Sequence, residues 1–205
     1  MADPTYINAA TGALIDGEAW VAIAHDSLSL PAASVTWTST NDGQTGDFSQ
    51  YLDMKILTYA KGSALSVNCN LDLRFNGDSS SSYSYQVHRG NGNGSTSWAG
   101  ANTSTPPQQW DAAEMPGSPS GQGSVFGTAV IDLFDINSGK WKSGIAMGGA
   151  GNNTDANSYV TLYTTCWNKI EPITEIELFT RNGGNFVANS KFSLFGILPR
   201  MVYGG

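Results

Sequence analysis

The sequence predicts an all-β protein, an antiparallel β-sandwich of jelly-roll type with long loops and an N-terminal arm. Several segments alternate apolar and polar residues with a period of two, which is typical of half-buried strands. Clusters of Gly, Asn and Ser separate these segments, and no stretch of useful length carries the 3.6-residue stripe of an amphipathic helix. A chain of 205 residues is long enough for one such domain of about eight strands.

The composition excludes some classes of partner. Charged residues make up only 13% of the chain, against roughly 25% in an average domain, so Ser, Thr, Asn, Gln and Gly must cover much of the surface. The net charge is −7 and no cluster of Lys or Arg is present, which argues against binding to nucleic acid. No apolar stretch reaches the length of a membrane span, and we expect neither a membrane helix nor a cleavable signal peptide.

The beginning of the chain does not follow the strand rhythm. Residues 1–35 mix alanine with apolar side chains around Trp20 and His25. We therefore expect an arm or edge strand at 1–35 that contacts partners, followed by the jelly-roll domain at 36–205. Trp20 is the contact candidate in this arm.

The clearest strand lies at 65–75. Its polar face includes Asp72 and Arg74, and the planar guanidinium of Arg74 could clamp a carboxylate of a neighbouring strand or subunit. The segment 51–60 alternates in the same way and is separated from it by Lys61-Gly62-Ser63, so the two are expected to form a hairpin. The apolar face of the clearest strand consists of Leu65, Val67, Cys69, Leu71, Leu73 and Phe75.

The next segment, Gly77-Asp78-Ser79, is open to two interpretations. It has the Gly-Asp-Ser order found at the nucleophile of chymotrypsin-type serine proteases, but such a site needs an upstream histidine and only His25 precedes it. A polar hairpin turn capped by Asn76 and Asp78 is the favoured interpretation. The strand that follows places His88 on its polar side, as a surface histidine.

The second half of the chain contains further strand-like segments rich in β-branched and aromatic residues. Turns containing Gly and Asn separate them, which tight hairpins require. The predicted strands lie at 124–136, 158–167, 174–180 and 191–198.

Residues 99–123 carry much of the proline and little alternation, which predicts a long surface loop. Trp98 and Trp110 bracket this loop. Together with Trp20 and Arg74, they are the side chains that we expect to contact a partner or ligand.

Residues able to support chemistry are few. No His and Cys cluster has zinc spacing, no pair of carboxylates stands out, and we expect no catalytic residues, no cofactor and no metal site. Calcium at Asn-rich and Asp-rich turns, such as Asn76 and Asp78 or residues 152–155, is the alternative to plain turn structure. Cys69 and Cys166 are expected to be buried free thiols, with a cross-strand disulfide as the other possibility.

Three stretches resemble a group of virion structural proteins from tailed bacteriophages, especially phages of aquatic bacteria. They are FSQYLDMKILTYAKGS, LDLRFNGDSSSSYSYQVHRGNG and ITEIELFTRNGGNFVANSKFSLFGI, which together cover a little over a third of the chain. The chain departs from that group at Ser79–Ser82, where a turn containing glycine is more usual. The resemblance implies jelly-roll modules that serve as capsid decoration (cement) proteins or parts of tail fibres, commonly as homotrimers.

The expected function is therefore that of a capsid decoration protein, without enzymatic activity, on the outer surface of an icosahedral phage head. Its partners would be the major capsid protein and two further copies in a homotrimer, assembled into the virion in the host cytoplasm. The alternative is a tail-fibre or receptor-binding head domain that recognises host surface glycans, although such a protein usually carries a shaft or attachment domain. A cellular carbohydrate-binding domain or a hydrolase is a more distant alternative.

Overall fold

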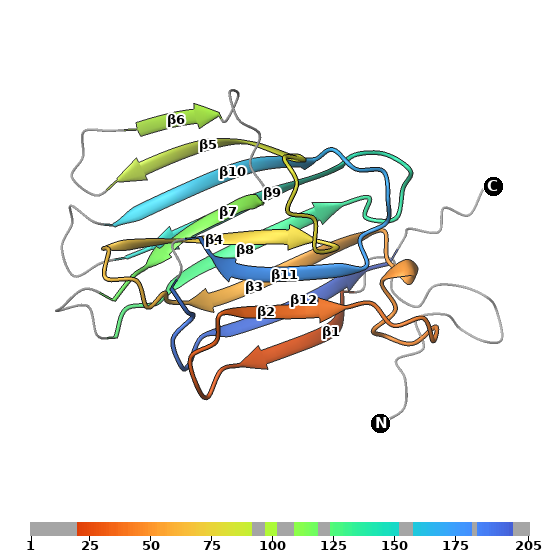
Figure 1. Ribbon diagram of the computed structural model, residues 1–205, viewed down its shortest axis with the longest axis horizontal. Helices are drawn as coiled ribbons and strands as arrows, with labels where there is room; N and C mark the ends of the chain where they lie inside the picture. Colours follow the sequence, from red (N-terminus) through yellow and green to blue (C-terminus); the bar gives the residue numbers. More distant parts are fainter. Residues whose placement is uncertain are drawn as a thin grey trace.

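The structure is an antiparallel β-sandwich, which confirms the predicted fold class. It was obtained as a computed structural model in which two sheets pack face to face (Figure 1). One single-turn 3-10 helix, Phe48–Gln50, is the helical element among the described residues. The structure describes residues 20–91, 97–101, 109–118, 124–151, 158–181 and 184–198.

The larger sheet has eight strands and the smaller sheet has four, and every neighbouring pair is antiparallel. Figure 1 shows the smaller sheet covering one face of the larger sheet, with β5 and β6 extending beyond the edge of the smaller sheet. The larger sheet has the order β1 (Trp20–Ser27), β12 (Lys191–Ile197), β3 (Asp53–Ala60), β8 (Gly127–Phe134), β9 (Lys142–Ala150), β10 (Tyr159–Trp167), β5 (Tyr83–Asn91) and β6 (Ser97–Ala101). The smaller sheet has the order β2 (Ser34–Thr38), β11 (Glu175–Thr180), β4 (Asn68–Phe75) and β7 (Trp110–Pro116).

The N-terminal part of the described chain supplies edge strands. β1 pairs with β12 at one edge of the larger sheet, with Trp20 opposite Ile197. β2 lies at an edge of the smaller sheet and pairs with β11. Of the expected arm at 1–35, residues 1–19 lie outside the described residues.

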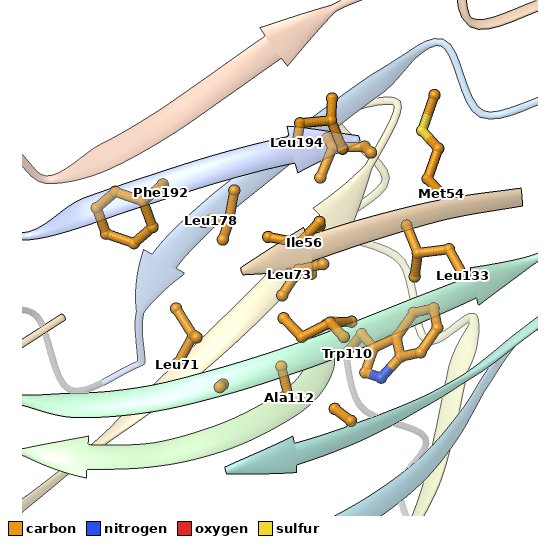
Figure 2. Close-up of a cluster of buried hydrophobic side chains, with 14 of the residues drawn as sticks. Met54, Ile56, Leu71, Leu73, Trp110, Ala112, Leu133, Leu178, Phe192 and Leu194 are labelled. Atoms are coloured by element: carbon orange, nitrogen blue, oxygen red, sulfur yellow. The ribbon is translucent and has the colours of Figure 1, made fainter. Parts of the chain in front are cut away.

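The predicted hairpin between β3 and β4 is wrong. β3 lies between β12 and β8 in the larger sheet, whereas β4 lies between β11 and β7 in the smaller one. Both strands have an apolar face, and placing them in opposite sheets lets Ile56 and Leu73 bury those faces within one core (Figure 2). Neither side chain is exposed to solvent.

The turns rich in Gly and Asn also divide into two kinds. Those after β5, β8 and β9 join strands that pair with each other, although β6 and β9 were not among the predicted strands. The turn at 76–82 instead carries the chain from one sheet to the other, as does the segment between β11 and β12. At the first corner Asn76 and Gly77 have φ values of 52° and 64°, and the Asn76 side-chain oxygen accepts hydrogen bonds from the backbone of Thr174 and Glu175.

The predicted surface loop at 99–123 is the largest error in the fold prediction. It contains the end of β6 and all of β7, and every residue of β7 is buried. The segment Trp110–Pro116 does not alternate between apolar and polar residues, because both faces of β7 are buried. Its acidic residues Asp111 and Glu114 are buried in ion pairs. Proline and charged residues are typical of exposed segments, so they predicted a surface loop where a buried strand lies.

The two sheets meet around Trp110, which is completely buried (Figure 2). Its indole ring packs edge-on against Phe75 at 5.1 Å between ring centroids, and Phe75 in turn packs against Trp167 at 5.5 Å. On the larger sheet the indole lies directly over Gly144. A Cβ atom there would lie 2.3 Å from Trp110 Cη2, so the close approach of the sheets requires glycine at this position.

The Gly144→Ala variant should therefore lose about 3 kcal/mol of unfolding free energy, because the added methyl overpacks the contact with Trp110. Urea denaturation measures this loss. Gly149→Ala is the matched control on the outward face of the same strand, where the nearest atom to an added Cβ is the Tyr159 carbonyl oxygen at 3.9 Å. The control should be as stable as the wild type or slightly more stable. Equal losses in the two variants would contradict the assigned packing.

Candidate functional site

The outward face of the larger sheet is unusually apolar. Four outward side chains stand in register across adjacent strands, with Leu57 beside Val130, Val130 beside Met147, and Met147 beside Leu162. Met147 is 59% exposed and Val160, two residues before Leu162, is 64% exposed. We call this surface the apolar face and define it by Leu57, Tyr59, Val130, Phe134, Ile145, Met147, Val160 and Leu162.

Two shallow hollows lie on either side of the line through Met147 and Leu162. One has a volume of about 610 Å³ and is lined by residues that include Phe134, Ile145 and Cys166. The other, of about 630 Å³, is lined by residues that include Gly90, Phe126 and Gly149. The side chains of Met147 and Leu162 therefore form a ridge between two depressions of the apolar face.

Among the described residues, Gly90 and Gly149 in the second hollow have no close packing neighbour. A Cβ atom at Gly90 would meet nothing within 4 Å, and one at Gly149 would meet only the Tyr159 carbonyl oxygen. Each of these glycines is the next-to-last residue of its strand, beside a turn rich in Gly and Asn.

Charge on this face is sparse in the described part of β3, β8, β9, β10 and β5, where the charged outward side chains are Asp53, Lys55 and Asp132. Lys55 and Asp132 face outward and form an ion pair with each other. Lys55 also lies over the indole of Trp20, with Nζ 4.9 Å from the ring centroid. Trp20 is 51% exposed and is thus accessible at the β1 edge of this outward side.

The other sequence-based contact candidates lie elsewhere. Arg74 is on the outward side of the smaller sheet, where it donates to Glu177 Oε2 at 3.0 Å and stacks over Phe179. Arg74 therefore links β4 to the neighbouring strand β11 of its own chain. Trp110 is completely buried, so its choice as a surface contact was wrong. Trp98 belongs to β6, and its side chain is outside the described part of the structure. The structure does not bring the four candidates together.

Buried charged groups form networks that sequence reasoning missed. Asp72 was expected on an exposed polar face, but it is completely buried and accepts two hydrogen bonds from Arg181, each of 2.8 Å. Arg181 also pairs with Asp111, and Arg89 pairs with Glu114 at 2.9 Å. Burial raises the pKa of Glu114, and the guanidinium of Arg89 opposes this effect. Arg181 follows β11 in a turn-like sequence, so nothing in the pattern indicated its partner.

The Gly77-Asp78-Ser79 segment is engaged in structural contacts. Asp78 accepts hydrogen bonds from the Ser80 backbone at 2.9 Å and from Trp167 Nε1 at 2.8 Å. Burial acts to raise the pKa of Asp78, but the hydrogen bonds from Ser80, Trp167 and Ser82 outweigh it and lower the pKa to about 2. The carboxylate thus ties the inter-sheet corner to β10.

The two histidines are far from each other. His25 Nδ1 lies 2.8 Å from Ser193 Oγ on the neighbouring strand β12, and His88 is exposed on β5. β1 and β5 are six strand steps apart in the sheet, about 29 Å at the usual spacing. The contact between His25 and Ser193 is an exposed cross-strand pair at a sheet edge.

Metal ligands and thiols give no further site in the described residues. That part of the chain has no group of three or more His, Cys, Asp or Glu placed to hold a metal ion, and the calcium candidates at 152–155 lie outside it. Cys69 and Cys166 are free, as predicted, and Cys69 is buried, whereas Cys166 is only partly buried, contrary to the prediction. Burial raises the pKa of Cys69 to about 11, which keeps it protonated. Within the described ranges no helix is long and apolar enough to span a membrane.

Comparison with protein-family models, with curated proteins and with solved structures found no match to this chain. Its function must therefore be argued from the surface just described.

Asp78→Asn should destabilise the protein in a pH-dependent way. Because the folded-state pKa is lowered, the ionised carboxylate contributes stability above about pH 4, and this contribution disappears as the pH falls towards 2. We expect a loss of about 1 kcal/mol at pH 7, allowing for solvent screening of a partly exposed group. Chemical denaturation from pH 2 to 7 measures both proteins. A difference that stays constant over this range would show that the ionised state of Asp78 is unimportant.

Proposed function

We propose that the protein is a structural component of a phage particle, a capsid decoration protein that binds the major capsid protein on the outer surface of the head. The observation that carries this proposal is the apolar face, an exposed and nearly uncharged sheet surface of the kind that marks protein interaction sites. The resemblance of three sequence stretches to virion structural proteins supports the same role.

The strand order supports the jelly-roll part of the proposal. β5, β6, β9 and β10 are consecutive at one end of the larger sheet. When these four strands are set aside and the other eight are numbered in chain order, the sheets have the orders 1-8-3-6 and 2-7-4-5. This order is consistent with a double-sheet jelly roll, because strands that follow each other in the chain lie in opposite sheets except for the pair 4 and 5.

In this description two hairpins are added to a jelly roll. One hairpin consists of β5 and β6, and the other consists of β9 and β10. The two most exposed side chains of the apolar face, Met147 of β9 and Val160 of β10, lie on one of them. Added elements carry much of the functional variation among proteins that share a fold, because the scaffold does not need them. We therefore assign partner binding to the added hairpins.

Two further observations favour a structural role. The composition is poor in charge, so the surface outside the apolar face is mainly neutral and polar. The reactive groups singled out in the sequence also have structural partners, since Asp78 is bonded to Trp167 and His25 to Ser193. In this proposal the protein is not an enzyme and needs no cofactor.

Recognition of host glycans by a tail-fibre or receptor-binding domain is the second candidate. It is favoured by two tryptophans on the surface, Trp141 with 63% and Trp20 with 51% of their area exposed. Indole rings of this kind can stack on the apolar face of a sugar ring. A glycan array probed with recombinant protein tests this function. Strong and specific binding that is lost in Trp141→Ala would favour it over capsid decoration.

The decoration function predicts that antibodies against the recombinant chain label the heads of purified particles in electron microscopy. Cryo-electron microscopy of the same particles should place a sandwich of this shape on the outer shell. Labelling confined to tails would instead favour the receptor-binding function, and absence from particles would rule out both virion roles.

Met147→Glu should reduce binding to shells from which the protein has been removed by at least about tenfold, because a charge would be buried against the shell. Cosedimentation of protein with shells measures occupancy. Leu65→Glu is the control, since Leu65 is 84% exposed and lies outside the apolar face. Equal loss in both variants would place the contact elsewhere.

A further inference from the structure

We propose that the buried carboxylates of Asp72 and Asp111 share one proton at neutral pH, and that this proton holds the edge strand β7 to β4. Both residues belong to the smaller sheet, away from the apolar face, so the proposal goes beyond the proposed function and does not depend on it. It rests on the burial of the two groups, on their register and on the number of cations around them.

The two carboxylates stand opposite each other on neighbouring strands, since the register of β4 and β7 pairs Asp72 with Asp111. Asp72 is completely buried and Asp111 is 3% exposed. Like charges directly opposite each other destabilise a strand pair, and burial strengthens the repulsion because little water screens it. In the described part of the smaller sheet β4 is the one neighbour of β7, so the two carboxylates lie on the ladder that attaches this strand.

Arg181 is engaged mainly by Asp72. Its Nε atom donates to Asp72 Oδ2 and its Nη2 atom donates to Asp72 Oδ1, each at 2.8 Å. Such a bidentate pair is among the strong contacts that a guanidinium and a carboxylate form. Nη2 also touches Asp111 Oδ1, but this oxygen accepts no hydrogen bond of normal geometry from the described residues. One guanidinium therefore faces two carboxylates and neutralises one of them.

The neighbouring ion pairs leave no spare cation for this pair within the described part of the chain. Arg89 is bound to Glu114 at 2.9 Å, and Arg74 is bound to Glu177 at 3.0 Å. The whole group has three guanidinium groups and four carboxylates, namely Arg74, Arg89 and Arg181 with Asp72, Asp111, Glu114 and Glu177. A buried carboxylate without a counter-charge is costly, and such a group takes up a proton instead. The charges balance when the group holds one proton.

The other titratable side chains that face the pair do not supply the missing positive charge. They are Tyr85, Tyr163 and Cys69. Burial raises the pKa of Tyr163 and of Cys69, so both stay protonated and uncharged. Burial also raises the pKa of Asp72, and the hydrogen bonds from Arg181 oppose this rise. Because two facing carboxylates titrate together, the proton belongs to the pair rather than to one residue.

Loss of the proton would place two negative charges face to face between β4 and β7. β7 carries Trp110, which lies against the backbone of the larger sheet, and Glu114, which ties it to β5 through Arg89. Deprotonation at alkaline pH therefore weakens the attachment of β7 and, with it, the contact between the two sheets.

Urea denaturation of the full chain from pH 5 to pH 8 tests the proposal. Because the pair has a raised pKa in the folded state, its proton stabilises the fold fully below the aspartate pKa of about 4 in the unfolded chain, and this stability is lost as the pH rises. The unfolding equilibrium constant of the wild type should increase up to about tenfold per pH unit relative to Asp111→Asn, which needs no proton. Asp132→Asn is the matched control and should keep the wild-type slope, since Asp132 pairs with Lys55 on the larger sheet.

Carbon-13 NMR of the side-chain carboxyl groups detects the proton itself. At pH 7 the wild type should show an aspartate carboxyl signal at the position of a protonated acid. In Asp111→Asn the signal of Asp72 should lie at the ionised position, because Arg181 then has one carboxylate partner. Thermal unfolding establishes that both variants are folded.

Three results would overturn the proposal. The first is a full set of ionised aspartate signals at pH 7, and the second is a pH slope that Asp111→Asn and Asp132→Asn leave equally unchanged. The third is a metal cation that shifts the carboxyl signals of Asp72 and Asp111 and abolishes the slope, because the cation would then supply the missing charge. None of these results bears on binding to phage shells, so the proposed function would stand.

Discussion

The fold depends on one close contact between the sheets, the indole of Trp110 lying against the backbone of β9 at Gly144. Because a Cβ at Gly144 would lie 2.3 Å from the ring, glycine sets how near the sheets can come. Nearby, a Cβ at Gly148 would lie 2.8 Å from the side chain of Ala113. Small residues on facing strands thus let β7 lie directly on β9, and Phe75 completes the packing around the indole. Close packing of this kind tolerates little added volume.

The buried ion pairs are a consequence of this close contact between the two sheets. β7 is completely covered, so its acidic residues need partners, and Asp111 shares Arg181 with Asp72 while Glu114 pairs with Arg89. Ion pairs of this kind stabilise little relative to apolar residues of the same size, but losing one partner leaves an uncompensated charge. They therefore fix which strands can lie side by side more than they strengthen the fold. Arg181 links β11 to β4 and β7 in this way.

β9 carries glycine on both of its faces, in different surroundings. Gly144 faces inward and admits Trp110, whereas Gly149 faces outward over open space beside Met147. The inward side completes the sandwich, because sheets approach closely only where side chains are small or interlock. The outward side belongs to the apolar face. The proposed role in a phage particle adds a reason for such a surface, because particle proteins bind one another through extended faces.

Local patterns in the sequence were sufficient for the all-β class, for β3 and β4 as strands, and for the free cysteines, but they missed β6 and β9 as strands. These properties depend on neighbouring residues and on the period of apolar side chains. Tertiary structure alone decided that β3 and β4 lie in opposite sheets, that β7 is a buried strand, and that Asp72 is paired with Arg181. The apolar face could not be predicted for the same reason. Side chains from four strands meet there only after the register of the sheet is set, and register is a property of pairing between segments distant in the chain.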